Sequence, residues 1–151
     1  MNAIRWELVP FEKLTPVALY AILRLRSEVF VVEQACIFLD MDDKDKHCHH
    51  LMGWRNEELV AYTRLVPPGI SNAAPSIGRV VTSMSVRRSG IGKELMQHSI
   101  QAAIELFKAT TITIGAQLYL KKFYESFEFL QSSDVYLEDG IDHIEMTLQV
   151  Q

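Results

Sequence analysis

Residues 77–107 read IGRVVTSMSVRRSGIGKELMQHSIQAAIELF, and this stretch decides the fold class. Its first part, 77–86, is rich in valine and predicts a buried strand. The second part, 91–107, repeats apolar side chains at helical spacing and predicts a long amphipathic helix that packs on a sheet. A strand, a short glycine-bearing turn and a helix in direct succession are typical of a mixed α/β fold.

The rest of the chain predicts further strands and helices around this centre. Thr15 followed by Pro16 predicts a helix start, with an apolar stripe that reaches Phe30. Residues 36–46 are acidic and aperiodic, which indicates an irregular loop or a short helix. Strands are expected at 4–9, 50–55, 59–66, 110–114, 129–136 and 143–150, and another helix at 118–127. With 48% hydrophobic and 23% charged residues, we expect one domain, 1–151.

The bulk properties exclude several classes of protein. The formal charge of -4 argues against a nucleic-acid partner, because phosphate binding needs a concentrated basic face. No stretch has the roughly 20 apolar residues that cross a bilayer, and the first residues lack the features of a signal peptide. Cys36 and Cys48 show no disulfide spacing, which favours free thiols. We therefore expect a cytoplasmic protein without a membrane partner.

The turn between the central strand and helix has the chemistry of a phosphate site. A helix that starts directly after a strand exposes unpaired N–H groups at the positive end of its dipole. Gly90 and Gly92 allow close approach, and Arg87, Arg88 and Lys93 add positive charge. The expected ligand is a compact polyanion.

The spacing of its residues distinguishes this turn from two other kinds of phosphate-binding loop. An ordinary glycine-rich helix start remains an alternative. A nucleoside triphosphate loop needs Ser or Thr after Gly-Lys, and here Glu94 follows Lys93. A dinucleotide fingerprint needs a third glycine, which is missing. The remaining pattern is Arg/Gln-x-x-Gly-x-Gly/Ala, which Arg87, Gly90 and Gly92 satisfy.

This pattern resembles the pyrophosphate loop of the GNAT superfamily of coenzyme A-dependent N-acetyltransferases. The resemblance covers nearly the whole chain and is closest to the ElaA-like subgroup. Its matching segments are LRSEVFVVEQ (25–34), HLMGW (50–54), LVAYTRL (59–65), IGRVV (77–81), FY (123–124) and EDGIDHIEM (138–146). The resemblance implies a GNAT-like fold, with a central, mostly antiparallel twisted sheet of six to seven strands flanked by about four helices.

The resemblance also implies the residues that hold acetyl-coenzyme A. The acetyl and pantetheine portion is expected on the central strand, and the pyrophosphate on the turn. The expected cofactor-binding residues are Val80, Val81, Thr82, Arg87, Arg88, Ser89, Gly90, Ile91, Gly92, Lys93 and Gln117. Two positions depart from the superfamily pattern: Arg88 replaces a frequent glycine, and Glu128 replaces the glycine of a Phe-Gly-Phe turn. A left-handed Glu128 would cost roughly 1 to 2 kcal/mol.

Acetyl transfer to an amine needs a general acid and a general base. The resemblance assigns the acid to Tyr124, whose neighbours Phe123 and Phe127 also allow a purely aromatic packing role. Glu33 is the preferred base, and an ion pair with Arg26 is its structural alternative.

Other candidates for the base, and for contacts with the acceptor, lie elsewhere in the matching segments. His50, Glu138 and His143 are candidates for both roles, and Arg79 is a candidate for contact with the acceptor only. Cys36 and the run 47–50 suggest zinc, but adjacent residues of an extended segment point to opposite faces, so we expect no metal.

Three functions fit these observations. The first is acetyl transfer from acetyl-coenzyme A to a primary amine of a small molecule or peptide. The second is transfer of a longer acyl group, and the third is a coenzyme A-binding module without catalysis. The acidic run 40–45, with Glu33 and the turn at 138–139, predicts attraction of a cationic amine. A homodimer is one option for the assembly.

Overall fold

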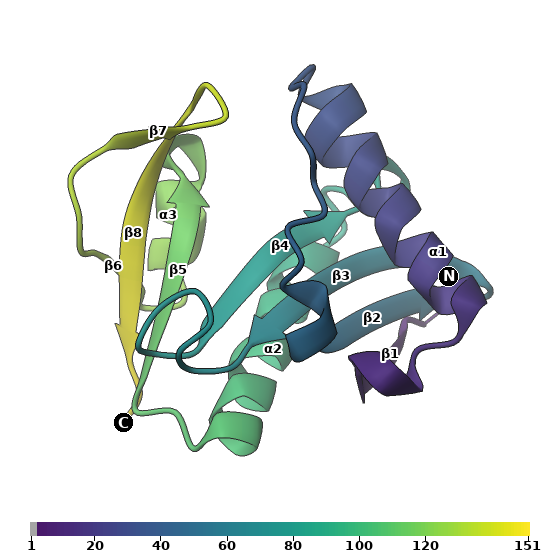
Figure 1. Cartoon of the computed structure of the whole chain (residues 1–151), viewed down its shortest axis with the longest axis horizontal. Helices are drawn as coiled ribbons and strands as arrows, with labels where there is room; N and C mark the ends of the chain where they lie inside the picture. The colour runs from purple at the N-terminus through teal and green to yellow at the C-terminus, as the bar shows by residue number, and fades with distance from the viewer. Residues whose placement is uncertain (1–2) are drawn as a thin grey trace.

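The computed structural model describes residues 3–151 and has the expected mixed α/β architecture (Figure 1). A π-helical segment, Ser27–Glu33, continues the first helix. The α-helices are α1 Pro16–Arg26, α2 Ile91–Phe107 and α3 Lys121–Glu125. The strands are β1 Arg5–Pro10, β2 His49–Arg55, β3 Glu58–Val66, β4 Ser76–Thr82, β5 Thr111–Gln117, β6 Leu130–Gln131, β7 Tyr136–Glu138 and β8 Ile141–Gln149.

The strands form two four-stranded sheets, whereas six to seven strands around one centre were expected. The first sheet has the order β1-β2-β3-β4 and the second the order β5-β8-β6, with β7 paired to β8; within residues 3–151 the strand pairs of both sheets are antiparallel. Helix α2 connects β4 to β5. The N–H of Thr113 donates to the carbonyl of Pro75 at 3.0 Å, where the two strands are closest, and beyond this point they diverge (Figure 1).

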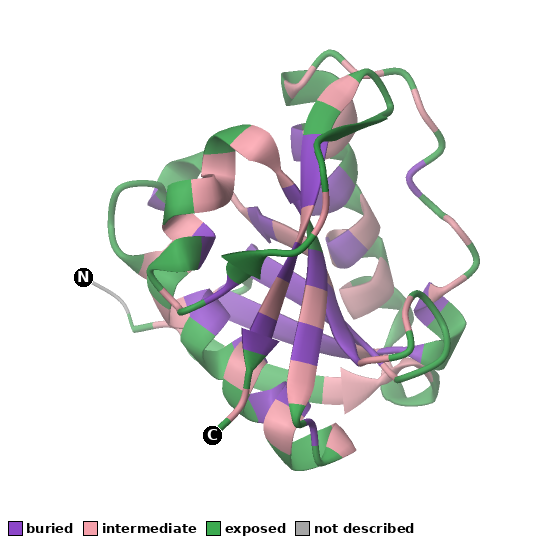
Figure 2. Ribbon diagram, turned by 90° about the vertical axis from the view of Figure 1, so that its left-hand side faces the viewer, coloured by how far each residue is buried: buried purple, intermediate pink, exposed green. Residues whose placement is uncertain are grey.

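Two helices cover opposite faces of the first sheet. Thr15 caps α1 through a 3.1 Å hydrogen bond from the N–H of Ala18, as its sequence predicts. Helix α1 packs with Tyr62, whereas Leu95 of α2 packs with Ala61. Neighbouring strand residues point to opposite faces, so the sheet lies between the helices. Its central strands β2 and β3 are largely buried, whereas the edge strand β1 has no buried residue (Figure 2).

Several predicted boundaries are wrong for local reasons. The strand predicted at 77–86 ends at Thr82, because the Ser83 side chain accepts from the N–H of Ser85 and starts a 3₁₀ turn. The strand predicted at 129–136 is divided into β6 and β7 by a bend. Within the helix predicted at 118–127, only α3 is α-helical. Within residues 3–151, no helix combines the length and apolar character needed to cross a membrane.

The acidic segment 36–46 is an irregular loop that arginines hold against the first sheet. Its buried or half-buried aspartates, Asp40, Asp42 and Asp45, are paired with arginines, so of the run's four aspartates only the exposed Asp43 forms no ion pair within residues 3–151. The ion pairs are Arg26–Asp40 at 2.7 Å, Arg26–Asp45 at 2.8 Å, Arg64–Asp42 at 2.5 Å, Arg64–Asp45 at 3.1 Å, Arg79–Asp40 at 2.9 Å and Arg79–Asp42 at 3.4 Å. A buried network of this kind positions the loop.

Candidate active site

A cleft of about 550 Å³ lies where β4 and β5 diverge. The end of the π-helical segment, α3 and the turn between β7 and β8 complete its walls. It brings together eleven of the residues proposed from the sequence. These are Glu33, Arg79, Val80, Val81, Thr82, Arg87, Gly92, Gln117, Tyr124, Glu138 and His143.

The wall formed by β4 offers an open backbone edge. Each of β4 and β5 ends its own sheet, so their facing edges lack a continuous hydrogen-bonded ladder within the described chain. Arg79 has φ 51°, and the register of β4 against β3 shifts between Tyr62 and Arg64. This β-bulge changes the direction of β4 beside the cleft. An extended ligand with amide groups can pair with such an edge.

The turn before α2 has the geometry of an anion site. Gly90 has φ 86° and leaves open space where a side chain would lie. The first N–H groups of α2 have no partner within the helix. Arg88 has φ 63°, so the substitution for glycine places a non-glycine residue in a left-handed conformation. Only Arg87 and Gly92 of this turn line the cleft itself. The residues Arg88, Ser89, Gly90, Ile91 and Lys93 lie outside its lining.

Glu33 and Arg87 form an ion pair across the mouth of the cleft. The two carboxylate oxygens of Glu33 accept from the Arg87 guanidinium at 2.5 and 2.8 Å, and Arg87 also donates to the carbonyl of Thr82 at 3.2 Å. The hydrogen bonds from Arg87 lower the pKa of Glu33. The partner expected for Glu33, Arg26, is instead buried with aspartates.

Tyr124 is placed deep in the cleft by α3. Its side chain is buried and meets Phe123 and Phe129 edge to face. Its hydroxyl has no hydrogen-bond partner among residues 3–151. The hydroxyl oxygen is not fully enclosed by protein atoms, so a bound molecule can reach it. Burial raises the pKa of Tyr124 above that of an ordinary phenol. The hydroxyl is therefore a neutral donor, available to a bound group.

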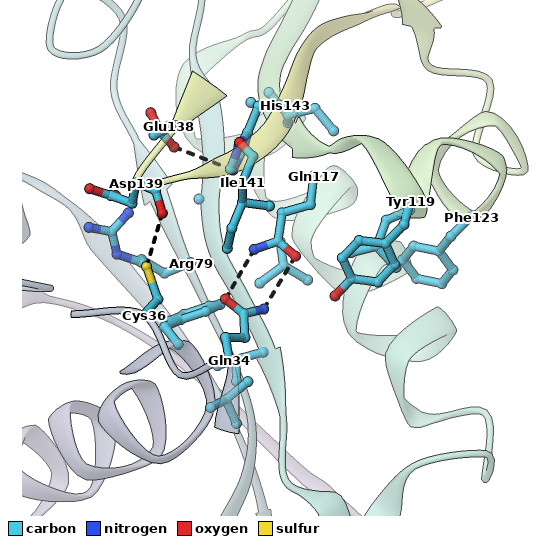
Figure 3. A pocket seen from close by; sticks show the side chains of 18 of the residues that line it. Gln34, Cys36, Arg79, Gln117, Tyr119, Phe123, Glu138, Asp139, Ile141 and His143 are labelled. Atoms are coloured by element: carbon cyan, nitrogen blue, oxygen red, sulfur yellow. Dashed lines mark hydrogen bonds and ion pairs between the residues drawn. The ribbon is translucent and has the colours of Figure 1, made fainter. Parts of the chain in front are cut away.

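The far end of the cleft joins segments that are distant in the sequence (Figure 3). The side-chain amides of Gln34 and Gln117 exchange two hydrogen bonds of 3.2 Å. The thiol of Cys36 donates to the carbonyl of Asp139 at 3.2 Å. Sequence reasoning missed Gln34 and Cys36 as residues of this cleft, because no motif links a residue after a helix to a turn about 100 positions later.

His50 does not reach the cleft. It belongs to β2 of the first sheet and is buried, with Nδ1 2.6 Å from the Tyr62 hydroxyl and Nε2 2.9 Å from the Asp45 carbonyl. Both ring nitrogens are occupied, so His50 has a structural role in this geometry. His143 does line the cleft, 3.5 Å from Glu138. Both cysteines are free, and residues 3–151 contain no cluster of three potential metal ligands.

Comparison with known proteins identifies the family. Residues 22–150 match the acetyltransferase (GNAT) domain family. The chain belongs to the GNAT acetyltransferase family. This GNAT protein is 38% identical to the protein ElaA of Escherichia coli over 149 residues, 97% of each chain. It is 40% identical to a UPF0039 protein of Synechocystis over 148 residues, 97% of this chain and 96% of the relative.

A solved structure confirms the GNAT fold. The crystal structure of an acyl-CoA N-acyltransferase from Pseudomonas aeruginosa is 41% identical and superposes with a TM-score of 0.92. The match covers 96% of this chain and 99% of that one. The resemblance to ElaA-like GNAT proteins is thus confirmed, and this chain is an acyltransferase.

Proposed function

We propose that the protein transfers an acetyl group from acetyl-coenzyme A to a primary amine of a small molecule or peptide. Both substrates are bound together, and the amine attacks the thioester directly. The observation that carries this proposal is the open edge of β4 beside the phosphate-binding turn. The free thiols of Cys36 and Cys48 fit a reducing compartment, which supports the cytoplasm as the site of action.

The cleft fits the donor along its length. The turn before α2 presents unpaired N–H groups and Arg87 to the pyrophosphate. The backbone edge of β4 at Val80 and Val81 that faces β5 has no continuous ladder of hydrogen bonds. It can therefore pair with the amides of the pantetheine arm. Gln117 can give up one of its two hydrogen bonds with Gln34 and form one with an amide of acetyl-coenzyme A instead. A backbone N–H near Val81 is our candidate for stabilising the developing oxyanion.

The reaction needs two proton transfers. A C–N bond forms while the C–S bond breaks, so the nitrogen loses a proton and the thiolate gains one. Tyr124 is the proposed acid, because its raised pKa keeps the phenol protonated until the thiolate departs. Glu33 is the proposed base, acting through water. Its pairing with Arg87 makes it a weak base until the donor's pyrophosphate attracts the arginine.

The test is coenzyme A release with acetyl-CoA and a panel of polyamines, amino acids and peptides, with products identified by mass spectrometry. Octanoyl-CoA tests the longer-acyl alternative. Tyr124→Phe should lower turnover about 100-fold and leave the Kd for coenzyme A unchanged. Tyr20→Phe, on the exposed face of α1, is the matched control. Coenzyme A binding without transfer to any amine would favour the non-catalytic module.

A further inference from the structure

A second cavity of about 490 Å³ adjoins the cleft. The two cavities share lining residues that include Gly78, Arg79, Glu138 and Asp139. Arg87 and Tyr124, by contrast, line only the first cavity. The shared residues therefore lie between the second cavity and the part of the cleft that holds the turn before α2. An acceptor that uses it can reach the thioester without crossing the path of the donor.

Carboxylates without arginine partners lie at the junction of the two cavities. Glu138 has only His143 beside it, at 3.5 Å. Asp139 forms no ion pair within the described chain, and its backbone carbonyl accepts from Cys36. Arg79, on the opposite wall, is occupied by Asp40 at 2.9 Å. The junction thus presents negative charge to a group that approaches the thioester, which suits an ammonium ion.

A cation lies in the part of the second cavity that the cleft does not share. Lys44 lines this part with Ser71, Asn72 and Ser76, and so do Arg64, Asp42 and Glu145; Asp42 is paired with Arg64, and Glu145 accepts from the Ser132 hydroxyl at 2.8 Å. Its ammonium group donates to the Ser71 hydroxyl at 3.1 Å, and no carboxylate of residues 3–151 pairs with it. Asp40 and Asp42 are held by arginines, whereas the exposed Asp43 forms no ion pair among the described residues. An ammonium beside hydroxyl and amide donors is a site for a carboxylate.

We propose that the acceptor enters through this second cavity and is an amino acid or peptide with a free carboxylate. Glu138 and Asp139 hold its ammonium group at the junction, and Lys44 binds its carboxylate. The proposal rests on the acetyltransferase function proposed above and names the substrate class of that site. The bonds made and broken are those of acetyl transfer. The ammonium first gives one proton to Glu33 through water, the neutral amine attacks, and the second proton of the nitrogen replaces, through water, the one that Tyr124 gives to the thiolate.

The test uses ω-amino acids of increasing chain length and short peptides, each paired with its C-terminal amide. The wild type should have a kcat/KM about tenfold higher for the best acid than for its amide. Lys44→Ala should abolish this preference while keeping activity on the amide. Lys13→Ala, which removes an exposed lysine outside both cavities, should retain the preference. Calorimetry with the coenzyme A-loaded protein should show the same pattern in Kd.

The outcomes separate the two proposals. Equal use of acids and amides by the wild type, or a preference that survives Lys44→Ala, would overturn the acceptor assignment and leave acetyl transfer intact. Failure to transfer acetyl to any amine would instead reject the proposed function, and the acceptor assignment with it. An unchanged melting temperature of Lys44→Ala excludes loss of fold as the cause.

Discussion

Replacing Glu33 with glutamine should strengthen coenzyme A binding. In the free protein the Arg87 guanidinium donates two hydrogen bonds, of 2.5 and 2.8 Å, to the Glu33 carboxylate. The donor's pyrophosphate therefore competes with an internal anion for the same arginine. Glutamine keeps the size of the side chain and removes its charge, so the competition is weakened.

The size of the effect follows from the exposure of the pair. Glu33 and Arg87 have side-chain exposures of 35% and 34%, so solvent screens their attraction. An exposed ion pair contributes at most about 1 kcal/mol, which corresponds to about a fivefold lower Kd for coenzyme A in Glu33→Gln. Turnover should fall in the same variant, because the proposed base is lost.

Isothermal titration calorimetry with coenzyme A measures this effect. Glu28→Gln is the matched control, because Glu28 forms a similar exposed ion pair, with Arg24 at 2.9 Å. It should leave the Kd unchanged. If Glu33→Gln bound coenzyme A with the wild-type Kd or more weakly, the competition for Arg87 would be refuted.

Four further predictions concern stability and the turn. Gly90→Ala, at φ 86°, should lower the melting temperature by an amount equivalent to roughly 1 to 2 kcal/mol and weaken coenzyme A binding; wild-type values of both would contradict the anion-site geometry. Glu128→Gly should instead stabilise the fold by about 1 kcal/mol in urea unfolding, because φ is 74° there, and a loss of stability would count against this account. Arg26→Met should cost about 3 to 5 kcal/mol by the same measurement, since Asp40 keeps Arg79 and Asp45 keeps Arg64 but the buried network then has one carboxylate more than it has guanidinium groups; a cost below 1 kcal/mol would show that the network matters little. Burial alone would raise the pKa values of Asp42 and Asp45, but their arginine partners lower both, so the stabilisation is present above pH 4 and should be lost as the pH falls below it; a melting temperature that stays constant from pH 5 to pH 3 would argue against this.

Much of the fold was predictable because its signals are local. The cap of α1 depends on Thr15 and a residue three positions later, and the stripe of α2 depends on spacings of three and four. The hairpin of β2 and β3 lies around Asn56, which has φ 57°, as a tight turn requires. The boundaries that were wrong, such as the end of β4, depend on single side-chain caps that compete with the strand.

The candidate site was predictable in part. A motif and its order along the chain pointed to the turn before α2 and to Tyr124, and Arg87, Gly92 and Tyr124 do line the cleft. The actual partner of Glu33 was not found, since Arg87 lies 54 positions away. His50 lies in a matching segment, yet its ring is buried against Tyr62 and Asp45. Segment similarity alone does not tell a buried histidine from one in the cleft.

The sequence by itself determined that this chain is a mixed α/β protein, because periodicity, caps and glycine placement act over a few residues. Its resemblance to GNAT proteins, carried by the matching segments, predicted the family and an anion site at the turn before the long helix. Only the tertiary structure decided which charges remain free. Arginines from α1, β3 and β4 neutralise the acidic loop, and the turn between β7 and β8 leaves its carboxylates open at the cleft, because pairing of charges depends on distances in space.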